Sequence, residues 1–268
     1  QLYDALSRPR SPAQVEQLNL KLEQANGASQ SSTLTLLNRD GLAIAASNWR
    51  TATSNVGVDY SFRPYVQQAL AQGRGSFYGI GVTTGEPGYF LSQAIRDGDG
   101  RALGVIVIKI ELAALEREWL RTPDIAMVSD AHDVVFLASR NDWRYRILDP
   151  LDDAERRELR ITRQYANQTL SPLRKDTLRV LDDGASLARI EQPALPHPVI
   201  WQTTRLDEHG WRLHLLHDAS TPATSSTQVS IGAAAWRRVS NCSCSMRRSL
   251  RCSAGVGTSA AISRRSKV

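Results

Sequence analysis

The chain has 268 residues, which is enough for one large domain or two small ones. It carries 33 Lys and Arg against 27 Asp and Glu, a formal net charge of +6. The segment after Asp218 holds eight of the basic residues and no acidic one, which leaves 25 basic against 27 acidic side chains before it. The main body is therefore mildly acidic, and it shows no basic stripe interleaved with aromatic residues. We expect no nucleic-acid partner.

All three cysteines, Cys242, Cys244 and Cys252, lie in the C-terminal segment. The body therefore needs no disulfide framework, and two cysteines one residue apart without a nearby histidine do not favour zinc. No stretch approaches the roughly 20 apolar residues that span a bilayer. The chain begins with Gln1, which suggests a segment cut from a longer protein. We expect no metal, no cofactor and no transmembrane segment in it.

The first predicted element is a long N-terminal helix within residues 1–30. Ser11 and Pro12 are typical of a helix start, and Gly27 follows its end. Apolar side chains recur at helical spacing at Val15, Leu18, Leu22 and Ala25. This stripe indicates a core-packing helix, and we also expect a homodimer contact along its apolar face.

Residues 31–122 are predicted to form the first α+β unit. Turn residues at 39–41 and 97–100 separate runs that alternate apolar and polar side chains. The predicted strands span 33–38, 42–46, 76–80, 89–96 and 102–111, and the predicted helices span 59–72 and 112–120. Asp59 or Ser61 is expected to cap the helix at 59–72.

Residues 123–219 partly repeat this pattern and are predicted to form a second unit. Its strands are expected at 125–129, 134–139, 177–181, 185–190, 200–205 and 211–217, with a charged helix at 152–160. The fold class is therefore α+β, with two consecutive antiparallel sheets flanked by helices. Beyond Ser220 the periodicity vanishes, and we expect the basic segment at 220–268 to be disordered.

Lys109 is the most informative residue of the body. It lies near the end of the most apolar strand, and alternation places it on the same face as Val105 and Val107. A lysine in such a place costs desolvation energy unless an anion accompanies it. The alternative is a lysine that extends from the strand end into solvent.

Arg63 is a second candidate anion ligand. It begins a predicted helix, where backbone N–H groups and the helix dipole already favour an anion. Its planar guanidinium also matches a carboxylate in two parallel hydrogen bonds. The alternative is an exposed arginine at a helix start. In either case we expect Arg63→Ala to change folding stability little, and to abolish ligand binding if Arg63 is a ligand. Tyr60 and Tyr65 lie nearby and offer hydroxyl groups or simple packing.

Several runs together resemble one known family. They are Leu36 to Leu42 (LLNRDGL), Asn48-Trp49, Asp59 to Tyr65 (DYSFRPY), Gly73 to Tyr78 (GRGSFY), Gly88 to Ser92 (GYFLS) and Gly104 to Lys109 (GVIVIK). They resemble the periplasmic domain of the four-carbon dicarboxylate sensor histidine kinases, the DctB-like family, whose domains have a double PAS-like fold (dCache, or tandem PDC). The resemblance covers residues 1 to about 217. The DYSFRPY run is its most specific part.

The resemblance implies a membrane-distal PAS-like unit at 31–122 that binds ligand and a membrane-proximal unit at 123–219 that relays its state. The family's ligand-binding positions map onto Tyr60, Arg63, Tyr65, Tyr89, Ser92 and Lys109, and Thr83 and Thr84 offer hydroxyls from the adjacent loop. Two separate cations suit a ligand with two carboxylates, such as succinate, malate or fumarate. No catalytic residue is implied.

The family also implies a periplasmic domain of an inner-membrane protein, with a response regulator and a dicarboxylate transporter as partners. The chain departs from the family after residue 217, where a second transmembrane helix and a kinase core would follow. We therefore expect this chain to be no enzyme by itself.

Two alternatives remain open at this stage. A hydrolase is conceivable because His209, His214 and His217 cluster near the last strand, but no Gly-x-Ser-x-Gly elbow is present. A sensor or chemoreceptor domain for an amino acid or another carboxylate would need an acidic group for an ammonium, which Asp59 or Glu86 would supply.

Overall fold

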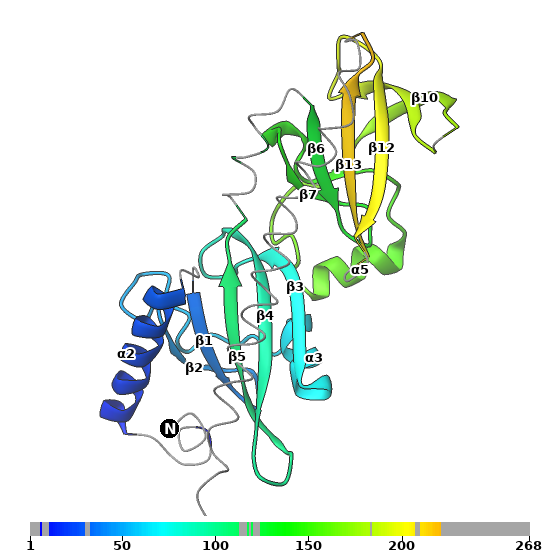
Figure 1. Cartoon of the computed structure of the whole chain (residues 1–268). Coiled ribbons are helices and arrows are strands. Elements are labelled where there is room, and N and C mark those ends of the chain that lie inside the picture. The colour runs from blue at the N-terminus through cyan, green and yellow to red at the C-terminus, as the bar shows by residue number, and fades with distance from the viewer. Residues whose placement is uncertain are drawn as a thin grey trace, which may run out of the picture. The chain divides into compact units, whose positions relative to one another are not determined.

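The structure of the chain, a computed structural model, describes residues 6, 11–29, 33–112, 117, 119, 124–182, 184–206 and 210–220 (Figure 1). Residues 1–219 form one compact unit. The predicted helix at 112–120 and the basic segment at 220–268 lie almost entirely outside the described residues.

The first sheet has five antiparallel strands in the order β2-β1-β5-β4-β3. The strands are β1 (Thr33–Asn38), β2 (Ala43–Ala46), β3 (Arg74–Ile80), β4 (Pro87–Arg96) and β5 (Ala102–Ile110). Helix α2 (Pro12–Ser29) packs on β2 and β1, and α3 (Pro64–Gln72) packs on β3 and β4 (Figure 1). The predicted strands agree with these bounds to within one or two residues at an end.

The second sheet has six strands in the order β10-β11-β12-β13-β6-β7. The strands are β6 (Ile125–Ser129), β7 (Val135–Ala138), β10 (Arg174–Val180), β11 (Ser186–Gln192), β12 (Val199–Leu206) and β13 (Trp211–Asp218). Helix α5 (Asp153–Ile161) begins with a capping box between Asp152 and Glu155. The 3₁₀ turn η1 (Asn141–Trp143) and the short parallel pair β8 (Arg146–Ile147) and β9 (Ser171–Pro172) were not predicted.

The prediction of a helix over 59–72 is wrong at its start. Helix α3 begins at Pro64, and its N-cap is Arg63, which makes no side-chain cap. Asp59 instead accepts a hydrogen bond from the backbone N–H of Ser61 at 2.8 Å. Asp and Ser favour such local turns as readily as helix caps, and here the turn prevails.

The apolar face of α2 contacts the chain's own sheet. Leu18 and Leu22 are buried, Val15 is half-buried and Ala25 is exposed. Leu18 and Leu22 are thus buried within the chain, on a helix that contacts β1 and β2. The homodimer through this helix stays a prediction.

An aromatic seam connects the two sheets, formed by Tyr78 and Tyr89 from the first sheet and Phe136 and Trp211 from the second. The rings of Tyr78 and Phe136 lie 4.1 Å apart, and those of Tyr89 and Trp211 lie 5.3 Å apart. The Tyr78 hydroxyl donates to the Phe136 carbonyl at 3.2 Å. Such packed aromatic pairs add to the stabilisation from buried area, so the two sheets form one packed unit.

Asn19 is the polar anchor of α2. Its side chain is buried, and its Oδ1 accepts the backbone N–H of Ala46 in β2 at 2.9 Å. Asn19→Ala leaves that N–H buried without a partner, which costs about 1–3 kcal/mol. We expect this loss in the free energy of unfolding measured by urea denaturation. Gln17→Ala, on the exposed side of the same helix, is the matched control, and an equal loss in both variants would contradict the anchor.

Candidate functional site

A pocket lies on the first sheet beside the start of α3 and the loop that joins β3 to β4. We call it the first pocket. Its walls are formed by Thr33, Thr35, Leu37, Asn55, Tyr60, Arg63, Tyr65, Gly81, Val82, Thr83, Thr84, Phe90, Val107 and Lys109. The space open to the centre of a water molecule is about 20 Å³, which is room for about one or two waters. A larger ligand therefore requires the walls to open.

Lys109 is buried in the wall of this pocket, with 6% of its surface exposed. It does not extend into solvent. Its Nζ donates to the Thr84 hydroxyl at 3.2 Å. Burial lowers the pKa of Lys109, while the nearby charges of Glu111 and Glu86 oppose that shift. The predicted face is confirmed, because Val107 lines the same pocket.

Arg63 is also buried, with only 1% of its surface exposed. Its Nη1 donates to the carbonyls of Thr162 at 2.9 Å and Arg163 at 3.1 Å, and its Nη2 donates to the Ile80 carbonyl. Its Nε is buried and has no hydrogen-bond partner among the described residues. Burial lowers the pKa of Arg63 as well.

The expectation that Arg63→Ala changes stability little is therefore wrong in its premise. That expectation treated Arg63 as an exposed residue at a helix start. Its side chain instead satisfies three backbone carbonyls, two of them about a hundred residues away in the chain. Removing it leaves buried acceptors unpaired, at a cost of about 1–3 kcal/mol for each group.

The two predicted tyrosines also line the first pocket. Tyr65 stacks on Phe90 with ring centroids 5.1 Å apart. Burial raises the pKa of both Tyr65 and Tyr60, so both hydroxyls are neutral near pH 7. They can donate hydrogen bonds to an anion.

Tyr89 and Ser92 do not line the pocket. Tyr89 points to the opposite face of β4, where its ring packs on Trp211. Ser92 lies under α3, where its hydroxyl contacts the carbonyls of Tyr65 at 2.6 Å and Gly75 at 3.1 Å. The structure thus brings together six of the eight predicted ligand residues: Tyr60, Arg63, Tyr65, Thr83, Thr84 and Lys109.

Three polar residues of the pocket were missed by sequence analysis. Asn55 donates from Nδ2 to the Thr35 hydroxyl at 2.8 Å and accepts at Oδ1 from the Thr83 hydroxyl at 2.7 Å. Thr33 pairs with Lys109 across β1 and β5. Period-two alternation on β1 is a signal that would have found Thr33 and Thr35. No sequence signal places Asn55, which lies in an irregular loop.

The charge of the pocket is one-sided. Arg63 and Lys109 both line it, and its described walls contain no Asp or Glu. Asp59 and Glu86, the acids suggested for an ammonium, are not among the lining residues. Both cations already have partners within the chain, the Thr84 hydroxyl for Lys109 and backbone carbonyls for Arg63. Two cations in the wall of one pocket attract a further anion, so the geometry suits an anionic ligand.

The hydrolase alternative finds no support at His214. His214 Nδ1 lies 3.2 Å from Trp201 Nε1 and 2.9 Å from the Thr203 hydroxyl, and its Nε2 lies 3.0 Å from the Ser129 hydroxyl. A general base would have to activate a serine that a substrate can reach. Ser129 is fully buried, His217 pairs with Asp124, and His209 lies outside the described residues.

Two further properties concern only the described residues. They contain no group of three or more His, Cys, Asp or Glu side chains arranged to hold a metal ion. None of their helices combines the length and hydropathy needed to cross a bilayer.

Comparisons with known proteins agree with this geometry, although no protein-family profile matches the chain. It is 31% identical over 219 residues to the C4-dicarboxylate transport sensor protein DctB of Rhizobium meliloti, covering 81% of this chain and 35% of that protein. It is 36% identical over 173 residues to DctB of Pseudomonas aeruginosa, covering 65% and 28%. The chain thus spans about a third of the length of these relatives.

Solved structures match the same region. The sensor domain of the V. cholerae histidine kinase DctB superposes with a TM-score of 0.72 at 28% identity, covering 81% of this chain and 83% of that one. The periplasmic domain of RsbU from Chlamydia trachomatis superposes with a TM-score of 0.58 at 12% identity, covering 80% and 78%. This second match shows the fold alone.

The two sheets and the pocket define a sensor domain with a double PAS-like fold. Within that class, the chain belongs to the DctB-like family and corresponds to its sensor domain.

Burial of His214 makes stability depend on pH. Desolvation lowers its folded pKa from 6.5 to about 4. Neutral His214 therefore contributes its full stabilisation above its unfolded-state pKa of 6.5. This stabilisation is lost as pH falls from that value through the folded-state pKa of about 4. Between pH 7 and pH 5 we expect a loss of about 2 kcal/mol from this residue.

The measurement is urea denaturation at both pH values. His214→Gln should lose this part of the pH dependence, whereas His197→Gln, at an exposed histidine, should keep it. Direct NMR titration of the His214 imidazole gives the same answer without a variant. A pKa near the ordinary histidine value would contradict the prediction.

Proposed function

We propose that this chain is the extracytoplasmic ligand-binding domain of a sensor histidine kinase, and that its first pocket binds a four-carbon dicarboxylate. The observation that carries the proposal is the pair of buried cations, Arg63 and Lys109, in a pocket whose described walls hold no acid. A dianion would neutralise both. The names and sequences of the DctB relatives support the same ligand class.

The proposed roles follow from the donor groups of the residues that line the pocket. The unpartnered Nε of Arg63 is the donor for one carboxylate. The Nζ of Lys109 and the Thr84 hydroxyl beside it suit the other carboxylate. Tyr60, Tyr65 and Asn55 offer neutral groups to the middle of the ligand. A monocarboxylate leaves one buried cation without an anion, so it should bind much more weakly.

Ligand entry requires the pocket to widen, and the loop between β3 and β4 is the wall best able to move. Its Gly81 and Gly85 carry no side chains, and Gly85 adopts a positive φ of 69°. In the full-length protein, the proposed output is a kinase that signals through a response regulator to dicarboxylate transport genes. A homodimer within an inner-membrane receptor is part of the same proposal.

Calorimetry with the full chain tests the ligand class. Succinate, malate and fumarate should bind, whereas butyrate and neutral amino acids should not. Lys109→Gln should weaken succinate binding about 100-fold, since it removes a charged partner from a buried carboxylate. Lys21→Gln, at an exposed lysine of α2, is the matched control. Binding of amino acids without dicarboxylates, or unchanged affinity in Lys109→Gln, would refute the proposal.

Gly88 offers a subtler test, because it makes room for Lys109. A Cβ at Gly88 would lie 2.5 Å from Lys109 Cε and 2.9 Å from its Cγ. Gly88→Ala should therefore displace the flexible lysine with little effect on folding, and lower succinate affinity about tenfold, or about 1.4 kcal/mol. Gly98→Ala, where a Cβ meets nothing within 4 Å, is the control. Equal affinities in the two variants would exclude this placement of Lys109.

A further inference from the structure

A second, larger pocket lies beside α5, on the far side of the loop that walls the first pocket. We call it the arginine pocket. Its space open to water centres is about 730 Å³, within the range of roughly 300–1,000 Å³ that is typical of small-molecule sites. It is lined by Gly81, Val82, Gly85, Leu151, Arg156, Leu159, Arg160, Arg163, Tyr165, Ala166, Asn167, Gln168 and Leu170.

Three arginines give this pocket its charge. Arg156 and Arg160 are one turn apart on α5, and Arg163 follows the helix. No Asp or Glu is among the described lining residues, and none of the three arginines forms an ion pair within the described part of the chain. Arg163 does interact with one acid, because after the hydrogen bonds from Ser61 its charge helps to lower the pKa of Asp59. Guanidinium groups bind carboxylates and phosphates in a planar fork.

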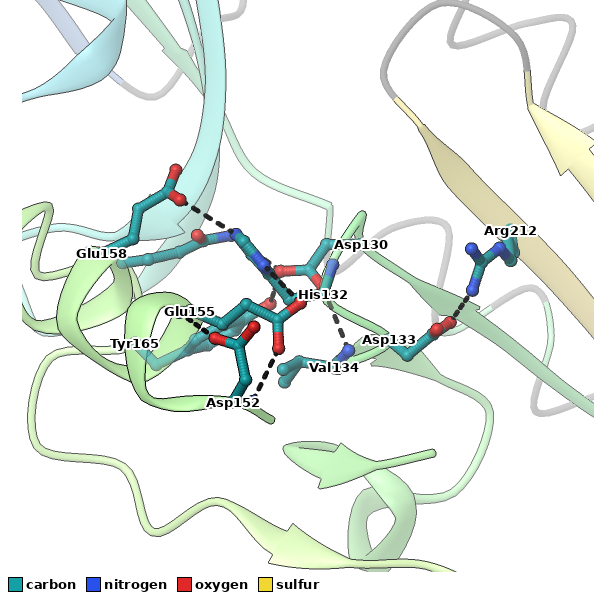
Figure 2. Close-up of polar contacts among 10 residues, drawn as sticks. Asp130, His132, Asp133, Val134, Asp152, Glu155, Glu158, Tyr165 and Arg212 are labelled. Carbon is teal, nitrogen blue, oxygen red and sulfur yellow. Dashed lines mark hydrogen bonds and ion pairs between the residues drawn. The ribbon is translucent and has the colours of Figure 1, made fainter. Parts of the chain in front are cut away.

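Two acids of α5, Glu155 and Glu158, are directed toward His132. Glu155 lies 3.5 Å from His132 Nδ1 and also accepts the backbone N–H of Asp152. Glu158 lies 3.9 Å from His132 Nε2. Figure 2 shows both carboxylates turned toward His132. Glu155 and Glu158 thus lie toward His132, whereas Arg156 and Arg160 line the pocket.

Arg163 adopts a rare backbone conformation, which its neighbours stabilise. Its φ is +50°, in the left-handed region that costs a non-glycine residue about 1–2 kcal/mol. Buried Asp130 fixes the residues that follow, because it accepts from the Tyr165 hydroxyl at 2.7 Å (Figure 2). It also accepts from Gln164 Nε2 at 3.0 Å. The Arg163 guanidinium lies 4.7 Å from the centroid of the Phe62 ring. Arg163 is exposed, so its backbone is fixed by its neighbours and its guanidinium by the contact with the Phe62 ring.

The remaining walls decide what kind of anion fits. Leu151, Leu159 and Tyr165 are buried and form an apolar floor. A compact anion such as phosphate would contact one or two guanidinium groups and leave this floor unused. A small molecule with two or three carboxylates on a carbon skeleton would use both.

We propose that the arginine pocket is a second binding site, distinct from the first pocket, for a small organic polycarboxylate. This goes beyond the proposed function, which places one dicarboxylate between Arg63 and Lys109. The two pockets share only Gly81 and Val82. Their charged ligands are different residues, so each site can be disabled separately.

The test is calorimetric titration of citrate, the probe, into the full chain carrying Lys109→Gln, so that the first pocket is weakened. Citrate should still bind. Adding Arg160→Gln should weaken it at least tenfold, and Arg156→Gln with Arg160→Gln should abolish it. Arg157→Gln is the matched control, because this exposed arginine of α5 is not among the lining residues. Urea midpoints check that every variant folds.

Three results would overturn the proposal. One is the absence of citrate binding in the Lys109→Gln chain. A second is equal weakening by Arg157→Gln and Arg160→Gln, which would indicate only general attraction to positive charge. The third is phosphate binding as tightly as citrate, which would remove the role of the apolar floor. Succinate binding to the unsubstituted chain is measured in parallel, so failure of the proposed function is seen separately.

Discussion

The buried guanidinium of Arg63 is the interaction on which the pocket and the packing of the second sheet both depend. A cation with 1% exposure is tolerable only if its donors find acceptors. Three carbonyls, those of Thr162, Arg163 and Ile80, accept hydrogen bonds from Nη1 and Nη2, and the buried Nε has no partner among the described residues. One side chain therefore closes the end of β3, holds the segment after α5, and supplies the positive charge of the pocket wall.

The surrounding contacts reinforce this junction. The Ile80 N–H donates to the Gln164 carbonyl at 2.8 Å, so the backbone of Ile80 bonds to the second unit directly, while its carbonyl accepts from Arg63. The aromatic seam continues the junction along β3 and β4, which explains why Tyr89 packs on Trp211 and does not line the pocket. Any anion bound at Nε shares its cation with carbonyls that belong to the second unit. Ligand binding and the contact between the two sheets would therefore both depend on the guanidinium of Arg63.

Much of the fold follows from local sequence pattern, and the buried polar contacts do not. Strand alternation correctly placed Lys109 and Val107 on one face, since a period of two needs no knowledge of distant residues. The burial of Arg63 could not be predicted in this way, because its partners Thr162 and Arg163 are about a hundred residues away in the chain. Its sequence neighbours indicate only a helix start. Asn55 was missed for a related reason, since its role depends on Thr35 and Thr83 approaching from separate segments.

Gly88 shows why residue type alone is a poor guide to a binding site. A glycine next to Pro87 at the start of β4 is typical of a weak strand end. In the folded chain its missing side chain is what allows Lys109 to lie across β4, since a Cβ there would overlap the lysine stem at 2.5 Å. Gly81 is similarly close, with a Cβ position 3.5 Å from Lys109 Nζ. The position of the Lys109 side chain therefore depends on the lack of side chains at Gly88 and Gly81 as well as on its hydrogen bond to the Thr84 hydroxyl. A substitution that adds one methyl group at Gly88 changes the electrostatics of the pocket without changing its charge.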